Sequence, residues 1–126
     1  MLKKTEFDKY RARLESQDIQ EVLSSGNPDA ISKLGGEVAA YYARVNNELA
    51  DVKDVVMALT FEYLQTKLDR KGKPITKGEA EIEAELVING KNEVTRRQMK
   101  YLCDGLDKIS YACSTRISSF KKEGFY

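Results

Sequence analysis

Apolar residues in the middle of the chain recur with the period of one long helix. Two rows with seven-residue spacing are offset by four residues: Val38, Val45, Val52 and Leu59, and Tyr42, Leu49, Val56 and Tyr63. Rows interleaved in this way form one apolar stripe along a helix. We therefore expect a helix from about Glu37 to Asp69, roughly 50 Å long at about 1.5 Å per residue. A stripe of this length needs a second long helix, from this chain or from a neighbouring copy, so we expect self-assembly.

A second apolar stripe predicts another long helix near the C-terminus, from about Asn92 to Lys122. Its apolar residues are three or four positions apart: Leu102, Leu106, Ile109, Cys113, Ile117 and Phe120. Between the two long helices, Gly72 and Pro74 indicate a loop. Thr76 and Glu79 then have the spacing of a capping box, which predicts a short helix to about Val87, ended by Asn89 and Gly90. Because the two turns and the short helix reverse the direction of the chain, we expect the long helices to be antiparallel.

The N-terminal segment predicts a weaker amphipathic helix from Thr5 to Ser24, followed by a cluster of helix-breaking residues. The Gly35-Gly36 pair suggests a hinge. We therefore divide the chain into an N-terminal helical arm, residues 1–36, and a helical hairpin region, residues 37–126, which is expected to oligomerise and which carries the basic segments described below. The predicted fold is all-α: a long antiparallel helical hairpin with a short intervening helix and an N-terminal arm, which oligomerises.

The composition favours a single soluble domain whose surface is rich in charged residues exposed to water. Of the 126 residues, 33% are charged, against about 25% in an average globular domain. The chain has no run of 18 apolar residues and no secretory signal at its start, so we expect a cytoplasmic protein without membrane contact. Cys103 and Cys113 lie ten residues apart on one predicted helix, about 15 Å along its axis, so both are expected to be reduced core residues.

Charge is distributed unevenly, although the formal net charge is only +1. Basic residues gather in two segments: Lys67, Arg70, Lys71, Lys73 and Lys77 in the first, and Lys91, Arg96, Arg97 and Lys100 in the second. If the long helices are antiparallel, both segments meet at one end of the hairpin. The clusters are then either a solvated surface or a phosphate-binding site. We take all nine as candidate DNA-binding residues.

Residues near the two basic segments indicate whether a duplex or a single strand would bind. Tyr63 and Tyr101 are either core residues or stacking surfaces for bases. An acidic strip lies between the two basic segments and would repel a broad duplex; it consists of Glu79, Glu81, Glu83 and Glu85. A single strand is narrow enough to avoid this strip.

Catalytic chemistry finds little support in the sequence. The chain has no histidine, the usual general base near neutral pH. It also has no glycine-rich phosphate loop, cysteine quartet or cofactor fingerprint. We therefore predict no enzyme activity, no cofactor and no metal site.

The last helix resembles the C-terminal helix of the UvsY family, the recombination mediators of tailed phages. The resemblance is carried by Met99-Lys100-Tyr101, Leu106-Asp107, Ser110 and Ala112, and by the order of elements from about Val55 to Lys122. It implies a ring-shaped homo-oligomer that binds single-stranded DNA, loosens the single-strand-binding protein and helps a RecA-like recombinase to load. It also implies an infected host cell as the location. The alternative is a small phage-type helical interaction protein, an inhibitor or assembly factor, without DNA binding.

Overall fold

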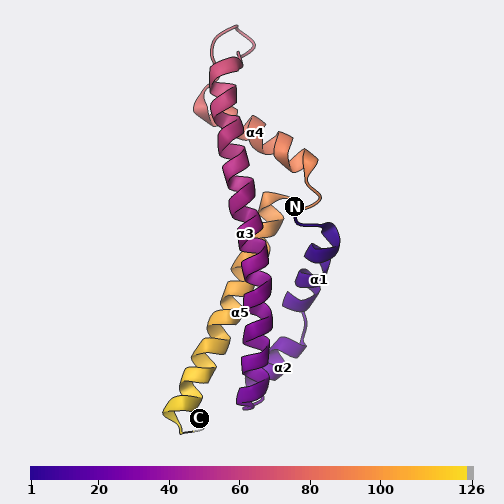
Figure 1. The fold of residues 1–126 in the computed structure, drawn as a ribbon, viewed down its shortest axis with the longest axis vertical. Coiled ribbons are helices and arrows are strands. Elements are labelled where there is room, and N and C mark those ends of the chain that lie inside the picture. Colours follow the sequence, from indigo (N-terminus) through magenta and orange to yellow (C-terminus); the bar gives the residue numbers. More distant parts are fainter. Residues whose placement is uncertain (125–126) are drawn as a thin grey trace.

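The computed structural model describes residues 1–124, which form five helices (Figure 1). In chain order they are α1 (Lys4–Leu14), α2 (Asp18–Ser24), α3 (Pro28–Thr66), α4 (Lys77–Lys91) and α5 (Arg96–Lys122). These residues contain no β-strand, only an isolated bridge between Leu68 and Pro74. The all-helical class predicted from the sequence is therefore confirmed.

Helix α3 is the longest element and runs through most of the length of the molecule (Figure 1). It begins at Pro28, nine residues before the predicted start, because the Asn27 side chain accepts hydrogen bonds from the Asp29 and Ala30 backbone and caps the helix. Gly35 and Gly36 therefore lie inside a helix, and the predicted hinge is wrong. Burial of Ile31 and Leu34 extends the apolar stripe past these glycines.

Helix α5 returns alongside the first part of α3, in the opposite direction (Figure 1). The predicted stripes face each other in one core. The fully buried members include Val38 and Val45 from α3 and Leu102 and Leu106 from α5. Both cysteines are free and buried, as predicted.

Helix α4 crosses the last part of α3, which α5 does not reach (Figure 1). Thr76 caps α4 by accepting a hydrogen bond from the Glu79 backbone at 3.2 Å, as its spacing predicted. The helix does not end at Asn89-Gly90 but continues to Lys91, since Ile88 packs against the core. The start of α5 accordingly moves from Asn92 to Arg96, where a capping box between Thr95 and Gln98 opens it.

The N-terminal arm is two helices that pack against the hairpin rather than one separate helix. The rings of Tyr10 and Tyr41 stack with centroids 4.4 Å apart. Arg44 of α3 donates hydrogen bonds to Glu6 at 3.2 and 3.3 Å. Leu14 covers Gly105 of α5 so closely that a Cβ atom there would lie 2.6 Å from a leucine methyl carbon. The predicted boundary at residue 36 therefore falls inside α3, and the arm shares the hydrophobic core.

Candidate nucleic-acid interface

The loop between α3 and α4 is an ordered turn organised by Asp69. One carboxylate oxygen of Asp69 accepts hydrogen bonds from the backbone of Lys71 at 2.8 Å and of Lys73 at 2.9 Å. The Asp69 carbonyl accepts from Gly72, whose φ of +80° is readily adopted by glycine. An acidic side chain thus shapes the backbone that presents the surrounding basic residues.

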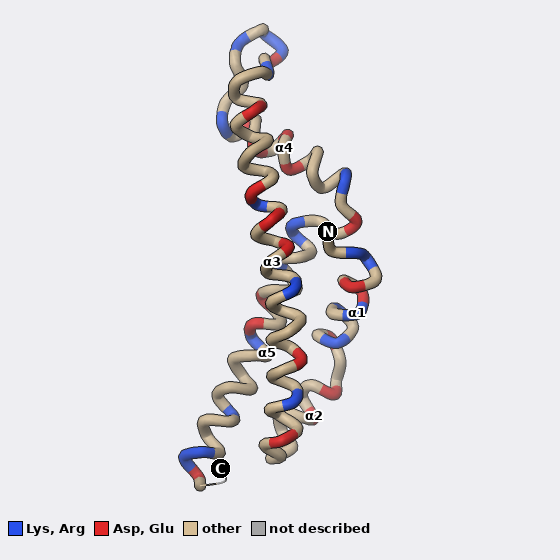
Figure 2. Tube along the Cα trace, viewed as in Figure 1, with Lys and Arg blue, Asp and Glu red and all other residues tan. Residues whose placement is uncertain are grey.

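Three cations on this loop are exposed and uncompensated. The side chains of Arg70, Lys71 and Lys73 form no ion pair with any residue between 1 and 124. They sit at the extreme end of the molecule, beyond the last turn of α3 (Figure 2). We call Arg70, Lys71 and Lys73 the loop cations. Exposed cations on a protruding turn are accessible to a phosphate backbone from several directions.

The acidic strip on α4 neutralises three of the predicted site residues. Lys67 lies 2.8 Å from Glu83, Lys77 lies 4.0 Å from Glu81, and Arg96 lies 3.8 Å from Glu85. The hydrogen bond to Glu83 raises the pKa of Lys67 above its ordinary value, so the ammonium stays charged. These three cations remain near the surface, but each has a carboxylate partner that a phosphate would have to replace.

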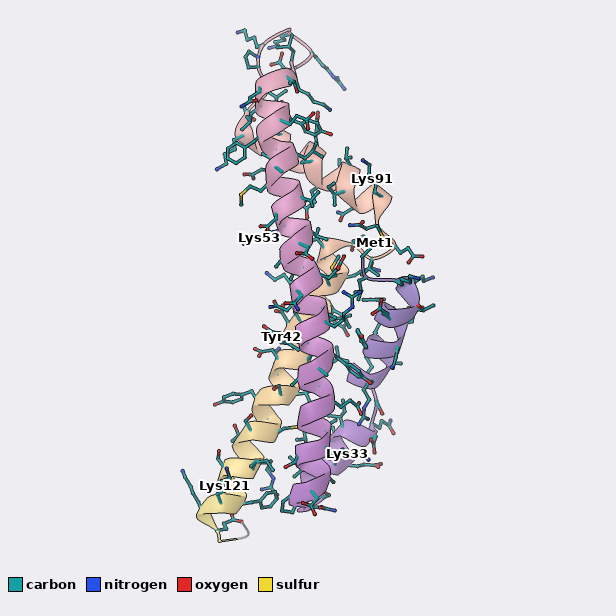
Figure 3. All side chains as sticks on the ribbon, viewed as in Figure 1. Met1, Lys33, Tyr42, Lys53, Lys91 and Lys121 are labelled. Atoms are coloured by element: carbon teal, nitrogen blue, oxygen red, sulfur yellow. The ribbon has the colours of Figure 1, made fainter. Side chains whose placement is uncertain are left out.

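The second basic segment does not meet the loop, contrary to the predicted convergence of all nine residues. Arg96 and Lys100 lie beside Lys53 of α3, whereas the loop follows Thr66. Thirteen residues of helix separate Lys53 from Thr66, about 20 Å along its axis. Figure 3 shows Lys91 at the end of α4 that is remote from the loop.

The physical reason is the length of α4, whose fifteen residues carry the chain back along α3 before α5 begins. We call Lys91, Arg96, Arg97 and Lys100 the central cations. Of these, Lys91, Arg97 and Lys100 are exposed and form no ion pair within the described part of the chain, whereas Arg96 pairs with Glu85.

Neither predicted stacking residue offers a free ring beside the loop cations. The Lys67 ammonium lies 4.2 Å from the centroid of the Tyr63 ring and covers one of its faces. The Tyr101 hydroxyl donates a hydrogen bond to Glu15 at 2.9 Å, on the side of α5 that faces the arm. That hydrogen bond, with partial burial, raises the pKa of Tyr101.

Sequence reasoning missed an exposed apolar surface on α3 and α4. Met57 and Phe61 lie one turn apart on α3, outside the two predicted rows, and Ile82 and Leu86 lie one turn apart on α4. All four side chains are more than half exposed. The signal was available, because each pair is apolar at a four-residue spacing on a face that the core does not use.

Two further properties limit the chemistry of the site. Residues 1–124 contain no cluster of three or more metal-binding side chains. Within the same range, none of the helices combines the length and apolar character needed to cross a bilayer. No protein family, curated protein or solved structure matches this chain.

Proposed function

We propose that this chain is a single-stranded DNA-binding recombination mediator that acts as a homo-oligomer. In this proposal it assists the loading of a RecA-like recombinase in place of single-strand-binding protein. The observation that carries it is the ordered turn with three exposed, unpaired cations at one end of the molecule. The resemblance of the last helix to the UvsY family supplies the biological setting, the cytoplasm of an infected host cell.

A narrow strand fits this end of the molecule better than a duplex. The loop cations occupy a single turn, and the glutamates of α4 begin directly behind it, with Glu79 and Glu83 beside Arg70 and Lys71. A duplex laid across this end would meet the carboxylates, whereas a single strand can follow the turn alone.

Weak binding by one subunit suits a protein that must pass its strand on. Three phosphate contacts give an exchangeable complex, and several subunits in one assembly raise the overall affinity through avidity without new contacts. The last part of α3, against which α4 packs, holds the turn away from the paired α3 and α5 (Figure 1).

Charge reversal at two matched positions tests the strand-binding role. The double variant Lys71→Glu, Lys73→Glu changes two loop cations, and Arg97→Glu, Lys100→Glu applies the same change to the central cations. We expect the first to weaken binding of a fluorescent oligothymidine by about tenfold or more, and the second by about threefold or less. Circular dichroism and light scattering check that both variants remain folded and assembled. Equal losses would place the strand elsewhere, and no loss in either would refute DNA binding by these residues.

The exposed apolar residues Met57 and Phe61 favour a second candidate function, a helical protein-interaction module without DNA binding. It predicts that the wild-type protein does not bind oligothymidine even at low salt. The same anisotropy titration therefore separates the two functions.

A further inference from the structure

An apolar groove lies between α3 and α4, beyond the start of α5. Its floor is formed by Val56, Met57, Phe61 and Leu64 of α3, and its volume is about 330 Å³. Phe61 is 61% exposed and Met57 is 51% exposed. Isolated apolar residues on a surface are ordinary, but a hollow that gathers several of them indicates a contact site.

The outer face of α4 carries a complementary ridge. Ile82 and Leu86 lie one turn apart and are 63% and 67% exposed, while Ala80 and Ala84 on the opposite face are fully buried. Glutamates line both sides of the ridge, at spacings that place Glu79 with Glu83 and Glu81 with Glu85. The ridge is therefore an apolar strip with acidic borders.

Three cations, Lys53, Lys77 and Arg96, and two carboxylates, Glu81 and Glu85, line the groove, so its charged residues leave an excess of one positive charge. Lys53 forms no ion pair among the described residues, and the pairs of Lys77 and Arg96 are long, at 4.0 and 3.8 Å. These cations are thus available to carboxylates from a second molecule. The excess positive charge of the groove, carried by Lys53, and the glutamates beside the ridge make the two surfaces complementary between copies of this chain.

We propose that the α4 ridge of one copy docks into the α3–α4 groove of the next copy. One such contact covers all four exposed residues, Met57, Phe61, Ile82 and Leu86. A two-fold contact through α3 alone would cover the first two and leave the ridge in water. The second copy is therefore the occupant that accounts for both surfaces together.

In the head-to-tail form proposed here, as opposed to a two-fold pair in which both ridges are exchanged, each bound copy still offers a free ridge or a free groove. Such head-to-tail contacts continue until a ring closes or a filament grows. None of the loop cations lines the groove, so the contact leaves them open to a strand. The inference deepens the proposed self-association and rests on it, but it does not depend on DNA binding.

Complementation between two variants tests the arrangement. Phe61→Glu places a charge in the groove and leaves the ridge intact, whereas Leu86→Glu alters the ridge and leaves the groove intact. Light scattering of the full chain should find each variant monomeric at concentrations where the wild type is assembled. An equimolar mixture should form a dimer and nothing larger, because only one groove and one ridge remain compatible. Val55→Glu, at a half-exposed apolar position on another face of α3, is the matched control and should assemble normally.

Each of the other possible results of this test contradicts a different part of the inference. If the wild type assembles and either variant does so too, self-association stands but uses another surface. If both variants are monomeric and their mixture gives no dimer, the contact is not head-to-tail. A monomeric wild type would refute the proposed self-association itself and leave the groove to an amphipathic helix of another protein. Circular dichroism checks folding, and Phe61→Ser and Leu86→Ser repeat the test should a glutamate variant unfold.

Discussion

The ammonium of Lys67 lies 2.8 Å from a carboxylate oxygen of Glu83, which joins the end of α3 to the middle of α4. Both side chains are exposed to water, at 43% and 44%. The pair therefore adds little to stability, since water screens it. Its larger effect is on the surface charge beside the loop cations, where it cancels one positive charge.

Removal of this carboxylate should strengthen strand binding. Glu83→Gln leaves a side chain of similar size and frees Lys67, so we expect about two- to fivefold tighter binding of oligothymidine at low salt. The gain should shrink as salt is added, because the interaction is electrostatic. Glu21→Gln on α2 makes the same charge change far from the loop and should have no effect. Unchanged affinity in Glu83→Gln would mean that Lys67 lies outside the strand path.

The number of loop cations predicts the salt dependence of binding. If each subunit that engages the strand contacts three phosphates, the slope of log affinity against log salt is about −2, from about 0.7 per phosphate. Affinity should then fall about 16-fold between 50 and 200 mM salt. Anisotropy titrations over this range measure the slope. A slope near zero would contradict a phosphate-binding turn, and a much steeper one would indicate that the central cations also take part.

The two adjacent glycines of α3 should respond differently to the same substitution. Gly36 has open space where a Cβ would lie, so Gly36→Ala should raise the free energy of unfolding by about 1 kcal/mol through helix propensity. At Gly35 a Cβ would lie 3.3 Å from the Cβ of Cys113, so the alanine crowds α5 and should lose most of that gain. Thermal or urea unfolding of the two variants compares them directly. Equal stabilisation would mean that α3 and α5 pack less closely at this point.

The contact between Glu6 and Arg44 should make the free energy of unfolding depend on pH in the acidic range. Partial burial raises the pKa of Glu6, but hydrogen bonds from Arg44 and the Lys3 backbone outweigh it and hold the pKa below its ordinary value of 4.5. A carboxyl with a lowered pKa in the folded state stabilises the fold above its unfolded pKa and loses that contribution as pH falls through the folded value. Glu6→Gln should therefore cost about 0.5 kcal/mol near pH 7 and clearly less near pH 3.

Urea unfolding of the wild type and Glu6→Gln at these two pH values measures the difference. Glu21→Gln makes the same substitution at a carboxylate without an ion pair among the described residues and serves as the control. A Glu6→Gln cost that grows toward low pH would show that the sign is wrong and that the carboxyl is not held charged in the folded state.

Local sequence signals predicted the helices well but their ends less well. The helix cap at Thr76 and the two apolar stripes depend on residues close together in the chain, so they can be recognised without tertiary information. The glycines at 35, 36 and 90 were read as breaks, yet all three lie within helices. At Gly35 and Gly36, burial of Leu34 and Val38 on either side outweighs a helix penalty of about 1 kcal/mol per glycine.

The candidate site was likewise predicted only in part from the sequence. The sequence identified the basic residues and the turn that carries Arg70, Lys71 and Lys73. It did not reveal that Lys67, Lys77 and Arg96 each have a glutamate partner, because those pairs depend on how α4 crosses α3 and meets the start of α5. The exposure of Met57 and Phe61, by contrast, could have been predicted, because both residues lie outside the two apolar rows that form the core.

The sequence by itself determined an all-helical chain, the two apolar faces that meet in its core and the basic turn after α3, because periodicity, capping and glycine-proline turns act over short stretches of chain. Only the tertiary structure decided that the second basic segment begins beside Lys53, away from the loop cations. The length of α4 sets the point on α3 beside which α5 begins, and the packing of Ile88 carries α4 through the predicted break to Lys91. The distance between two groups that are far apart in the sequence depends on such packing contacts, so a local sequence pattern cannot predict it.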